Sequence, residues 1–205
     1  QTSIQPPSPD AKTLMRFNWN AAIAQDPFDK KTIYFGSQFL HKSTNKGAAW
    51  KLISPDLTTN DSAKIDQTNN GGLSIDITGA ENHCTIIAIA PSSVQKDLIW
   101  IGTDDGNVQF TSNGGTTWNN VTANITGLPK GAWIPQIRTS TYNANEVFVV
   151  ANNYRQGDFA PYVFRTTDQG KTWTNILSAA KVTGYALSVI QDIVEPNLFF
   201  VGTEQ

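Results

Sequence analysis

The residues that decide the fold are TTDQGKTW, at positions 166–173. Two earlier stretches have the same form without gaps, STNKGAAW at 43–50 and TSNGGTTW at 111–118. All three fit the pattern Ser/Thr-x-Asp/Asn-x-Gly-x-Thr/Ala-Trp. Agreement of this kind at three places indicates an internal repeat, and a repeat governs the architecture of the chain that contains it. We refer to each stretch as an octet.

Apolar segments recur at matching places around the octets. A run of aromatic and β-branched residues precedes each octet, at 32–37, 98–103 and 146–151, and a fourth copy at 198–203 has no octet after it. Smaller apolar segments lie upstream of these runs, at 21–24, 86–89, 134–137 and 186–189. A third run leads into each octet, at 39–41, 108–110 and 162–164, and a fourth begins at its Trp. Such runs, bounded by turn residues, indicate strands.

Each unit therefore predicts four antiparallel strands, with the octet as the turn between the third and the fourth. Units of this kind in series are typical of the blades of a β-propeller. We expect an all-β chain of about three and a half blades that forms part of a larger propeller. The expected division is an extended linker or preceding segment at 1–16, a blade at 17–58, an inserted loop at 59–82, blades at 83–130 and 131–180, and half a blade at 181–205.

The residue types of the octet suit a turn. Asp168 and its counterparts Asn45 and Asn113 can accept backbone N–H groups, Gly can adopt positive φ, and Trp can pack between neighbouring sheets with its N–H near a partner. A catalytic or metal-binding role for Asp168 is disfavoured, because the two sister octets have Asn there and an amide cannot act as an acid. The structural octet positions are Ser43, Asn45, Gly47, Trp50, Thr111, Asn113, Gly115, Trp118, Thr166, Asp168, Gly170 and Trp173.

The composition excludes several classes of protein. The net charge is -2 with 16% charged residues, and Lys and Arg do not cluster, so no nucleic-acid partner is expected. No apolar stretch approaches the roughly 18 residues of a membrane span. The single cysteine, Cys84, precedes a strand-like run and is interpreted as a core thiol. Neither His41 nor His83 has a partner at metal-ligand spacing, so we expect neither a metal nor a cofactor.

The octet resembles the Asp-box, also called the bacterial neuraminidase repeat, of sialidases, endo-xyloglucanase propellers and sortilin-type receptors. The wider sequence is similar to large secreted bacterial proteins described as sortilin-like or glycosyl-hydrolase-like repeat proteins. The segments 16–20, 42–47, 53–58 and 100–106 carry that resemblance. It implies a propeller and a secreted, periplasmic or cell-surface location. It does not imply one activity, because this fold hosts both hydrolases and binding proteins.

The resemblance also implies which face of the propeller carries a site. In Asp-box enzymes the active site lies opposite the octet turns, where the second strand joins the third and where each blade joins the next. The loop 152–158, which mixes Asn, Tyr, Arg and Asp, is the strongest single candidate there. Candidate ligand-binding residues on that face are Trp19, His83, Asp104, Asp105, Trp133, Tyr154, Arg155, Asp158 and Tyr185.

Each candidate also has a purely structural interpretation. Trp19, Trp133 and Tyr185 precede or open inner strands near the expected channel mouth, where an aromatic ring can stack on a sugar or a peptide but can equally serve the core. Asp104 and Asp105 are a pair of carboxylates, yet Asp-Gly is also a favoured hairpin turn.

The sequence leaves two functions open. The leading hypothesis is a non-catalytic propeller that binds a peptide, protein or glycan on its loop face, completed by the remainder of the polypeptide or by a partner chain. The alternative is a glycoside hydrolase whose acid and base lie on different blades. A sialidase is disfavoured. Sialidases hold a carboxylate with three arginines and open with an arginine-proline motif. This chain lacks that motif, and its arginines are Arg16, Arg138, Arg155 and Arg165.

Overall fold

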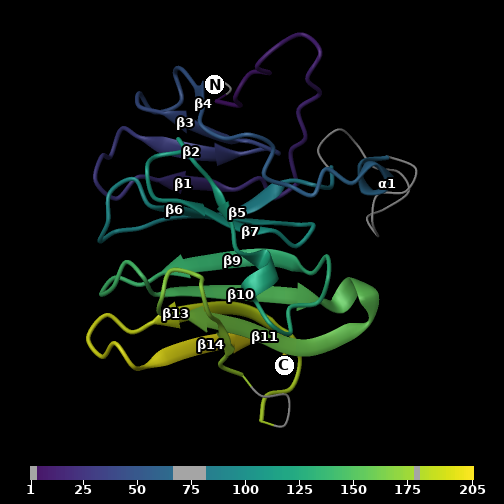
Figure 1. Ribbon diagram of the computed structural model, residues 1–205, viewed down its shortest axis with the longest axis vertical. Coiled ribbons are helices and arrows are strands. Elements are labelled where there is room, and N and C mark those ends of the chain that lie inside the picture. Colours follow the sequence, from purple (N-terminus) through teal and green to yellow (C-terminus); the bar gives the residue numbers. More distant parts are fainter. Residues whose placement is uncertain (1–3, 67–81, 178–180) are drawn as a thin grey trace.

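The computed structural model describes residues 4–66, 82–177 and 181–205. It confirms the all-β class, with three four-stranded antiparallel sheets and one two-stranded sheet. Within each sheet the strands follow one another in chain order. The sheets are stacked along the long axis of the molecule, from the first at one end to the last at the other (Figure 1). This is a series of propeller blades.

The strands fall on the apolar runs of the repeat to within a few residues, and each fourth strand begins one residue after its octet Trp, not at it. The strands are β1 (Ile23–Gln25), β2 (Ile33–Gly36), β3 (Leu40–Ser43), β4 (Lys51–Leu52), β5 (Ile86–Pro91), β6 (Ile99–Thr103), β7 (Val108–Thr111), β8 (Asn119–Asn120), β9 (Trp133–Thr139), β10 (Val147–Asn153), β11 (Asp158–Thr166), β12 (Thr174–Asn175), β13 (Ala186–Gln191) and β14 (Phe199–Thr203). The helical pieces are short: α1 (Ser62–Ile65) and two 3₁₀ turns, η1 (Thr122–Asn124) and η2 (Tyr154–Gln156).

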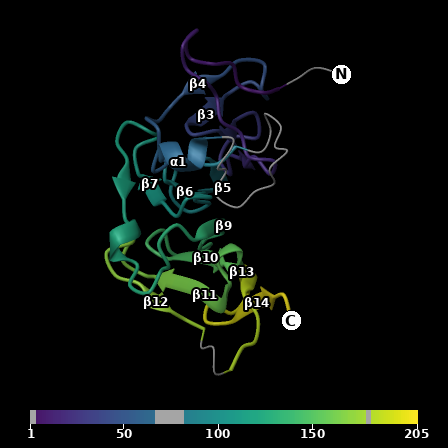
Figure 2. The ribbon, with the colours of Figure 1, turned by 90° about the vertical axis from the view of Figure 1, so that its right-hand side faces the viewer.

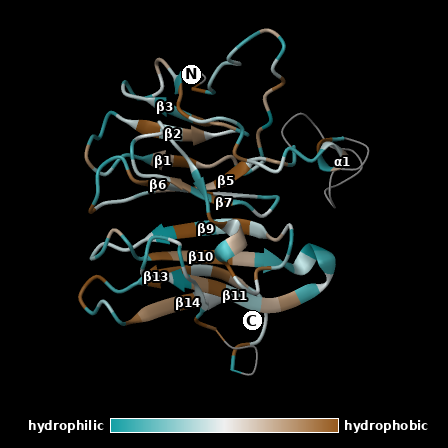
Figure 3. Cartoon of the chain, viewed as in Figure 1, coloured by the Kyte–Doolittle hydropathy of each residue, from teal (hydrophilic) through white to brown (hydrophobic). Residues whose placement is uncertain are grey.

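Apolar side chains fill the space between consecutive sheets. Between the first two sheets, Tyr34 and Leu40 pack with Ile86 and Ile101 in one cluster. The strands β6 and β10 are buried almost throughout, because each lies in a sheet covered on both faces, whereas β14 is half-buried or exposed. The hydropathy colouring follows this pattern, with brown strands and teal turns (Figure 3). The core is thus a row of inter-sheet layers.

Glycines in the second strands allow neighbouring sheets to approach. A Cβ built on Gly36 would lie 2.9 Å from the Cβ of Ile86 in the next sheet. A Cβ on Gly102 would lie 2.5 Å from Cγ2 of Ile134, again in the next sheet. The repeated Gly-Ser/Thr pair at the end of the second strand therefore reflects close packing between blades.

The three octets form the same hydrogen-bonded turn. The first hydroxyl accepts the Gly N–H, at 2.8 Å in the Ser43 octet, and the Asp or Asn Oδ1 accepts the N–H four residues on, at 2.9 Å from Asp168 to Thr172. The turn contains a feature that the sequence did not reveal: the fourth position also has positive φ, at 60° in Lys46 and 59° in Gln169. Two consecutive left-handed residues, and not the Gly alone, reverse the chain.

The octet tryptophans are half-buried. Trp118 donates from Nε1 to the carbonyl of Ile53 in the preceding blade at 3.1 Å. Trp173 donates to Gly170 within its own turn, while its ring meets Trp100 edge-on at 6.1 Å. The expected N–H partner is missing at Trp50, whose buried Nε1 has no acceptor among the described residues. Its ring instead packs edge-on against Phe35 at 5.9 Å.

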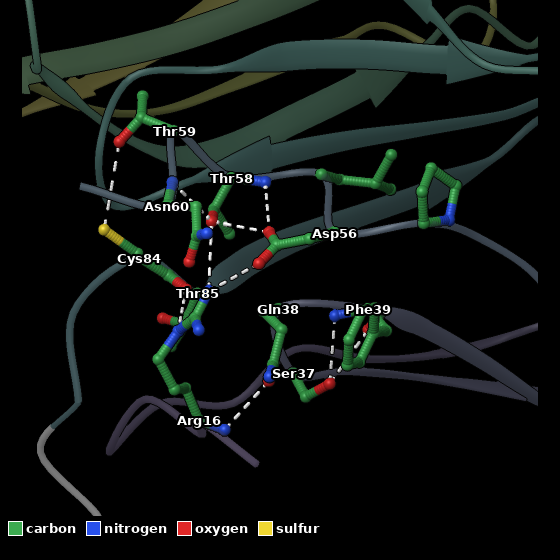
Figure 4. Close-up of polar contacts among 12 residues, drawn as sticks. Arg16, Ser37, Gln38, Phe39, Asp56, Thr58, Thr59, Asn60, Cys84 and Thr85 are labelled. Atoms are coloured by element: carbon green, nitrogen blue, oxygen red, sulfur yellow. Dashed lines mark hydrogen bonds and ion pairs between the residues drawn. The ribbon is translucent and has the colours of Figure 1, made fainter. Parts of the chain in front are cut away.

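Residues 4–16 form neither helix nor strand, and their end is docked on the first blade. Arg16 donates to the carbonyl of Cys84 at 3.2 Å and pairs with Asp56 at 2.7 Å (Figure 4). Its backbone N–H is bound by the side chain of Gln38 at 2.8 Å. Arg16 therefore ties the entering segment to the first two sheets.

Candidate functional site

A pocket opens where the inner strands of consecutive blades begin. Its volume is about 250 Å³, and its floor comes from β5, β9 and β13. One wall comes from the segment before β1 and the other from the connection between β10 and β11. The lining residues are Asn18, Asn20, Ile87, Trp133, Pro135, Asn152, Tyr154, Arg155, Tyr185 and Leu187. Figure 2 shows β5, β9 and β13 one below another along the long axis of the molecule.

The β10–β11 connection projects two of these side chains over the pocket. β10 runs to Asn153, η2 follows at once, and Gly157 returns the chain at φ 74°. Only glycine adopts that conformation freely, so the loop can turn directly after Tyr154 and Arg155. The loop that the sequence favoured is therefore the one that reaches the pocket.

Arg155 lies between aromatic rings. Its Cζ is 3.5 Å from the ring centroid of Trp133 and 4.4 Å from that of Tyr154. Such contacts hold the planar guanidinium by cation–π attraction. Partial burial lowers the pKa of Arg155, but an arginine stays charged at any physiological pH. The pocket thus carries a fixed positive charge.

The aromatic lining extends to the next blade. Tyr154 stacks on Tyr185 with centroids 4.6 Å apart and an interplanar angle of 25°. Phe159 meets Tyr185 at 6.3 Å. Because Tyr185 immediately precedes β13, it brings the last sheet into a lining that β5 and β9 also supply, and the shape of the pocket depends on how these sheets pack.

His83 and Asp104 lie behind the pocket, not in its lining. The ring of His83 is 6.0 Å from that of Trp133, and its Nε2 is 3.0 Å from the carbonyl oxygen of Asp104. The Asp104 carboxylate is fully buried and accepts from Thr85 Oγ1 at 2.6 Å and Asn18 Nδ2 at 3.0 Å. Burial raises the pKa of Asp104 by removing water from its charged form. Asp104 therefore supports the wall through Asn18.

Asp105 is a turn residue that also joins two loops. Its carboxylate accepts the N–H and the hydroxyl of Thr59, each at 2.7 Å, and the hydroxyl of Thr103 at 2.5 Å. The following Gly106 has φ 99°. The structure therefore supports the hairpin interpretation of Asp104 and Asp105, and neither carboxylate lines the pocket.

Asp158 and Trp19 do not line the pocket either. Asp158 accepts from Tyr162 Oη at 2.8 Å and from Asn153 at 3.2 Å, which closes the β10–β11 hairpin. Although burial opposes it, hydrogen bonds from Ala160, Tyr162 and Asn153 lower the pKa of Asp158. Trp19 is 73% exposed, and its neighbours Asn18 and Asn20 line the pocket in its place.

Sequence reasoning brought three of the lining aromatics and Arg155 together but missed the rest. Asn18, Asn20, Ile87, Pro135 and Leu187 carry no signal beyond their position at or before an inner strand. Asn152 lay within the favoured loop, and its buried Oδ1 has no donor among the described residues. Of the inserted loop 59–82, residues 67–81 lie outside the part that the structure describes.

The chemistry of the pocket lining is that of a binding site. Among the described residues, no group of three or more His, Cys, Asp or Glu side chains could hold a metal ion. In the same residues, no helix is long and apolar enough to cross a membrane. The pocket offers ring surfaces, amides and one guanidinium, which are binding groups.

The stacked sheets and the repeated turns together define this chain as a row of β-propeller blades. No family model and no curated protein sequence matches it. Among solved structures, an ancestral GH74 enzyme aligns with a TM-score of 0.61 at 20% identity, over 94% of this chain and 23% of that one. A GH74 enzyme of Niastella koreensis aligns with a TM-score of 0.52 at 16% identity, over 83% of this chain and 26% of that one.

A third structure, of Ycf48 bound to D1 peptide, aligns with a TM-score of 0.43 at 16% identity, over 76% of this chain and 42% of that one. The chain thus spans about a quarter of the length of the two GH74 enzymes. Identity at this level establishes a shared fold and leaves activity open.

Proposed function

We propose that this segment is part of a non-catalytic, extracytoplasmic propeller that binds a glycan in the pocket at its channel mouth. The observation that carries the proposal is the aromatic lining. Trp133, Tyr154 and Tyr185 line one pocket. Pockets that bind small ligands are usually lined by apolar ring surfaces with a few polar groups.

A hydrolytic function receives less support from the geometry. Glycoside hydrolysis uses a pair of carboxylates that flank the scissile bond. None of the ten residues that line the pocket carries a carboxylate. Asp104 and Asp105 are both buried, and each already accepts hydrogen bonds from neighbouring side chains. Binding therefore fits the pocket better than catalysis does.

Binding of the full-length protein to a panel of soluble plant and bacterial oligosaccharides tests the proposal. We expect saturable binding by calorimetry, lost in Trp133→Ala and in Tyr185→Ala. Tyr142→Ala is the matched control, because Tyr142 is exposed and bonds to the carbonyl of Asp192, away from the pocket lining.

Two outcomes would overturn it. One is an absence of binding to every saccharide tested. The other is release of shortened products at a rate that a single carboxylate substitution abolishes, which would make the propeller an enzyme.

A further inference from the structure

We infer that the glycan bound in this pocket is acidic, and that Arg155 binds the carboxylate of a uronic acid residue. The inference rests on the proposed function, because it names the chemistry of the sugar that the same pocket takes. Three features of the described residues carry it: an unpaired guanidinium, an orphaned amide oxygen and a lining without carboxylates.

Arg155 differs from two other arginines of the chain in lacking an acidic partner. Arg16 pairs with Asp56 at 2.7 Å, and Arg165 pairs with Glu146 at 2.5 Å. Arg155 is partly buried on two aromatic rings, yet among the described residues its guanidinium has no ion pair or hydrogen-bond acceptor. A planar guanidinium offers paired donors that match a carboxylate.

Asn152 supplies a complementary polar group. Its side chain lines the pocket, and its buried Oδ1 accepts no hydrogen bond from any described residue. Buried polar atoms are nearly always paired, so this atom needs a donor that the described residues do not supply. A sugar hydroxyl is such a donor. Arg155 and Asn152 therefore match a ligand that carries both an anionic acceptor and a neutral hydrogen-bond donor.

The surroundings leave room for a negative charge. Asp104, behind the wall, already accepts hydrogen bonds from Thr85 and Asn18, and among the described residues it makes no ion pair with Arg155. No residue of the lining is acidic. Trp133 and Tyr185 provide ring surface for the apolar face of a pyranose. A uronic acid residue combines that face with hydroxyls and a carboxylate on one ring.

The test compares two ligands with the same sugar backbone, one with free carboxylates and one in which methyl groups mask them. Oligogalacturonate and its fully methyl-esterified form are titrated into the full-length protein by calorimetry at low salt. We expect the acidic form to bind at least about tenfold more tightly, since hydrogen bonds to a charged group are the stronger ones. Arg155→Gln should remove that preference, so that the acid and the ester bind this variant with about equal affinity. Arg138→Gln, which alters an arginine outside the pocket, should keep the preference.

The outcomes separate this inference from the function on which it rests. Equal affinity for the acid and the ester, or a preference that survives in Arg155→Gln, overturns the acidic-sugar assignment and leaves glycan binding in place. Binding of an oligoglutamate peptide with no binding of any saccharide overturns both. Because the ligand comparison uses the unmodified protein, it stands even if the Arg155 variant folds poorly.

Discussion

The indole N–H of Trp118, in the second blade, donates to the carbonyl of Ile53, in the first, at 3.1 Å. The same ring packs against the apolar cluster between the two sheets. One side chain of an octet thus connects a turn of its own blade to the outer strand of the blade before. The octet is therefore both a turn and a joint between blades.

Replacing Trp118 by Ala should destabilise the protein by about 2–4 kcal/mol. The ring is half-buried, so the expected loss in the free energy of unfolding is smaller than for a fully buried aromatic residue. Trp118→Phe should cost less, because it loses the N–H bond but keeps part of the packing. Urea unfolding measures both, and an Ala variant as stable as the unmodified protein would contradict the joint.

Asp168→Asn should disturb its octet far less than Asp168→Ala. In the sister turn Asn113 keeps the acceptor bond to the N–H of Thr117 at 3.0 Å and donates from Nδ2 to its hydroxyl at 2.9 Å. An amide at 168 can do the same toward Thr172. Thermal unfolding of the two variants gives the ranking, and an Asn variant worse than Ala would refute a structural Asp168.

Asp168 should also contribute a pH-dependent part of the stability. The hydroxyl and N–H of Thr172 lower the pKa of Asp168 from 3.8 to about 2. Because the folded pKa lies below the unfolded one, this contribution is complete above about pH 4 and is lost as the pH falls toward 2. The difference in stability between the unmodified protein and Asp168→Asn should therefore shrink over that window. A difference that stays constant from pH 5 to pH 2 would contradict the assignment.

Gly102→Ala should cost about 1–3 kcal/mol, as expected for overpacking a filled layer. Its Cβ would meet Cγ2 of Ile134 at 2.5 Å and the backbone oxygen of Ile134 at 3.0 Å. Gly202 is the matched control, since its Cβ would meet chiefly the Oγ of Ser188 at 2.7 Å, the end of a side chain that can rotate. Chemical denaturation should show Gly102→Ala as the more damaging change. The reverse order would mean that these glycines do not set the spacing of the blades.

Asp104→Ala should cost about 2–4 kcal/mol, because Thr85 and Asn18 would lose their buried acceptor. Asp158→Ala should cost about 1 kcal/mol, since its partners are closer to water. Circular dichroism during thermal unfolding checks the order. If Asp104→Ala were as stable as the unmodified protein but no longer bound the ligand, Asp104 would be a ligand contact and not a structural residue.

Residues 1–205 expressed alone should associate. In the described residues β14 pairs only with β13, and Ile190 and Phe200 on these strands are 53% and 54% exposed. An open strand edge beside apolar surface favours pairing with other chains. Light scattering at several concentrations measures this. A monomer with one cooperative transition at low concentration would show that this end of the stack tolerates water.

The sequence determined the local structure of this protein because that structure depends on local chemistry. Hydroxyl, amide or carboxylate, Gly and Trp at fixed spacing specify one turn, and alternating turns and apolar runs specify short antiparallel strands. The left-handed fourth residue of the octet escaped the pattern, since Lys46 and Gln169 rarely take positive φ and only their neighbours' hydrogen bonds impose it.

The tertiary structure alone decided which candidates share a site. Trp133 and Arg155 lie in one blade, and Tyr185 joins them only because the next blade packs against it, which no single repeat encodes. The same packing buries Asp104 behind Asn18 and leaves Trp19 exposed to water. The sequence alone placed Asp104 and Trp19 on the same face of the propeller. Side-chain direction and inter-blade packing are long-range properties, and they separate the residues that can touch a ligand from those that support them.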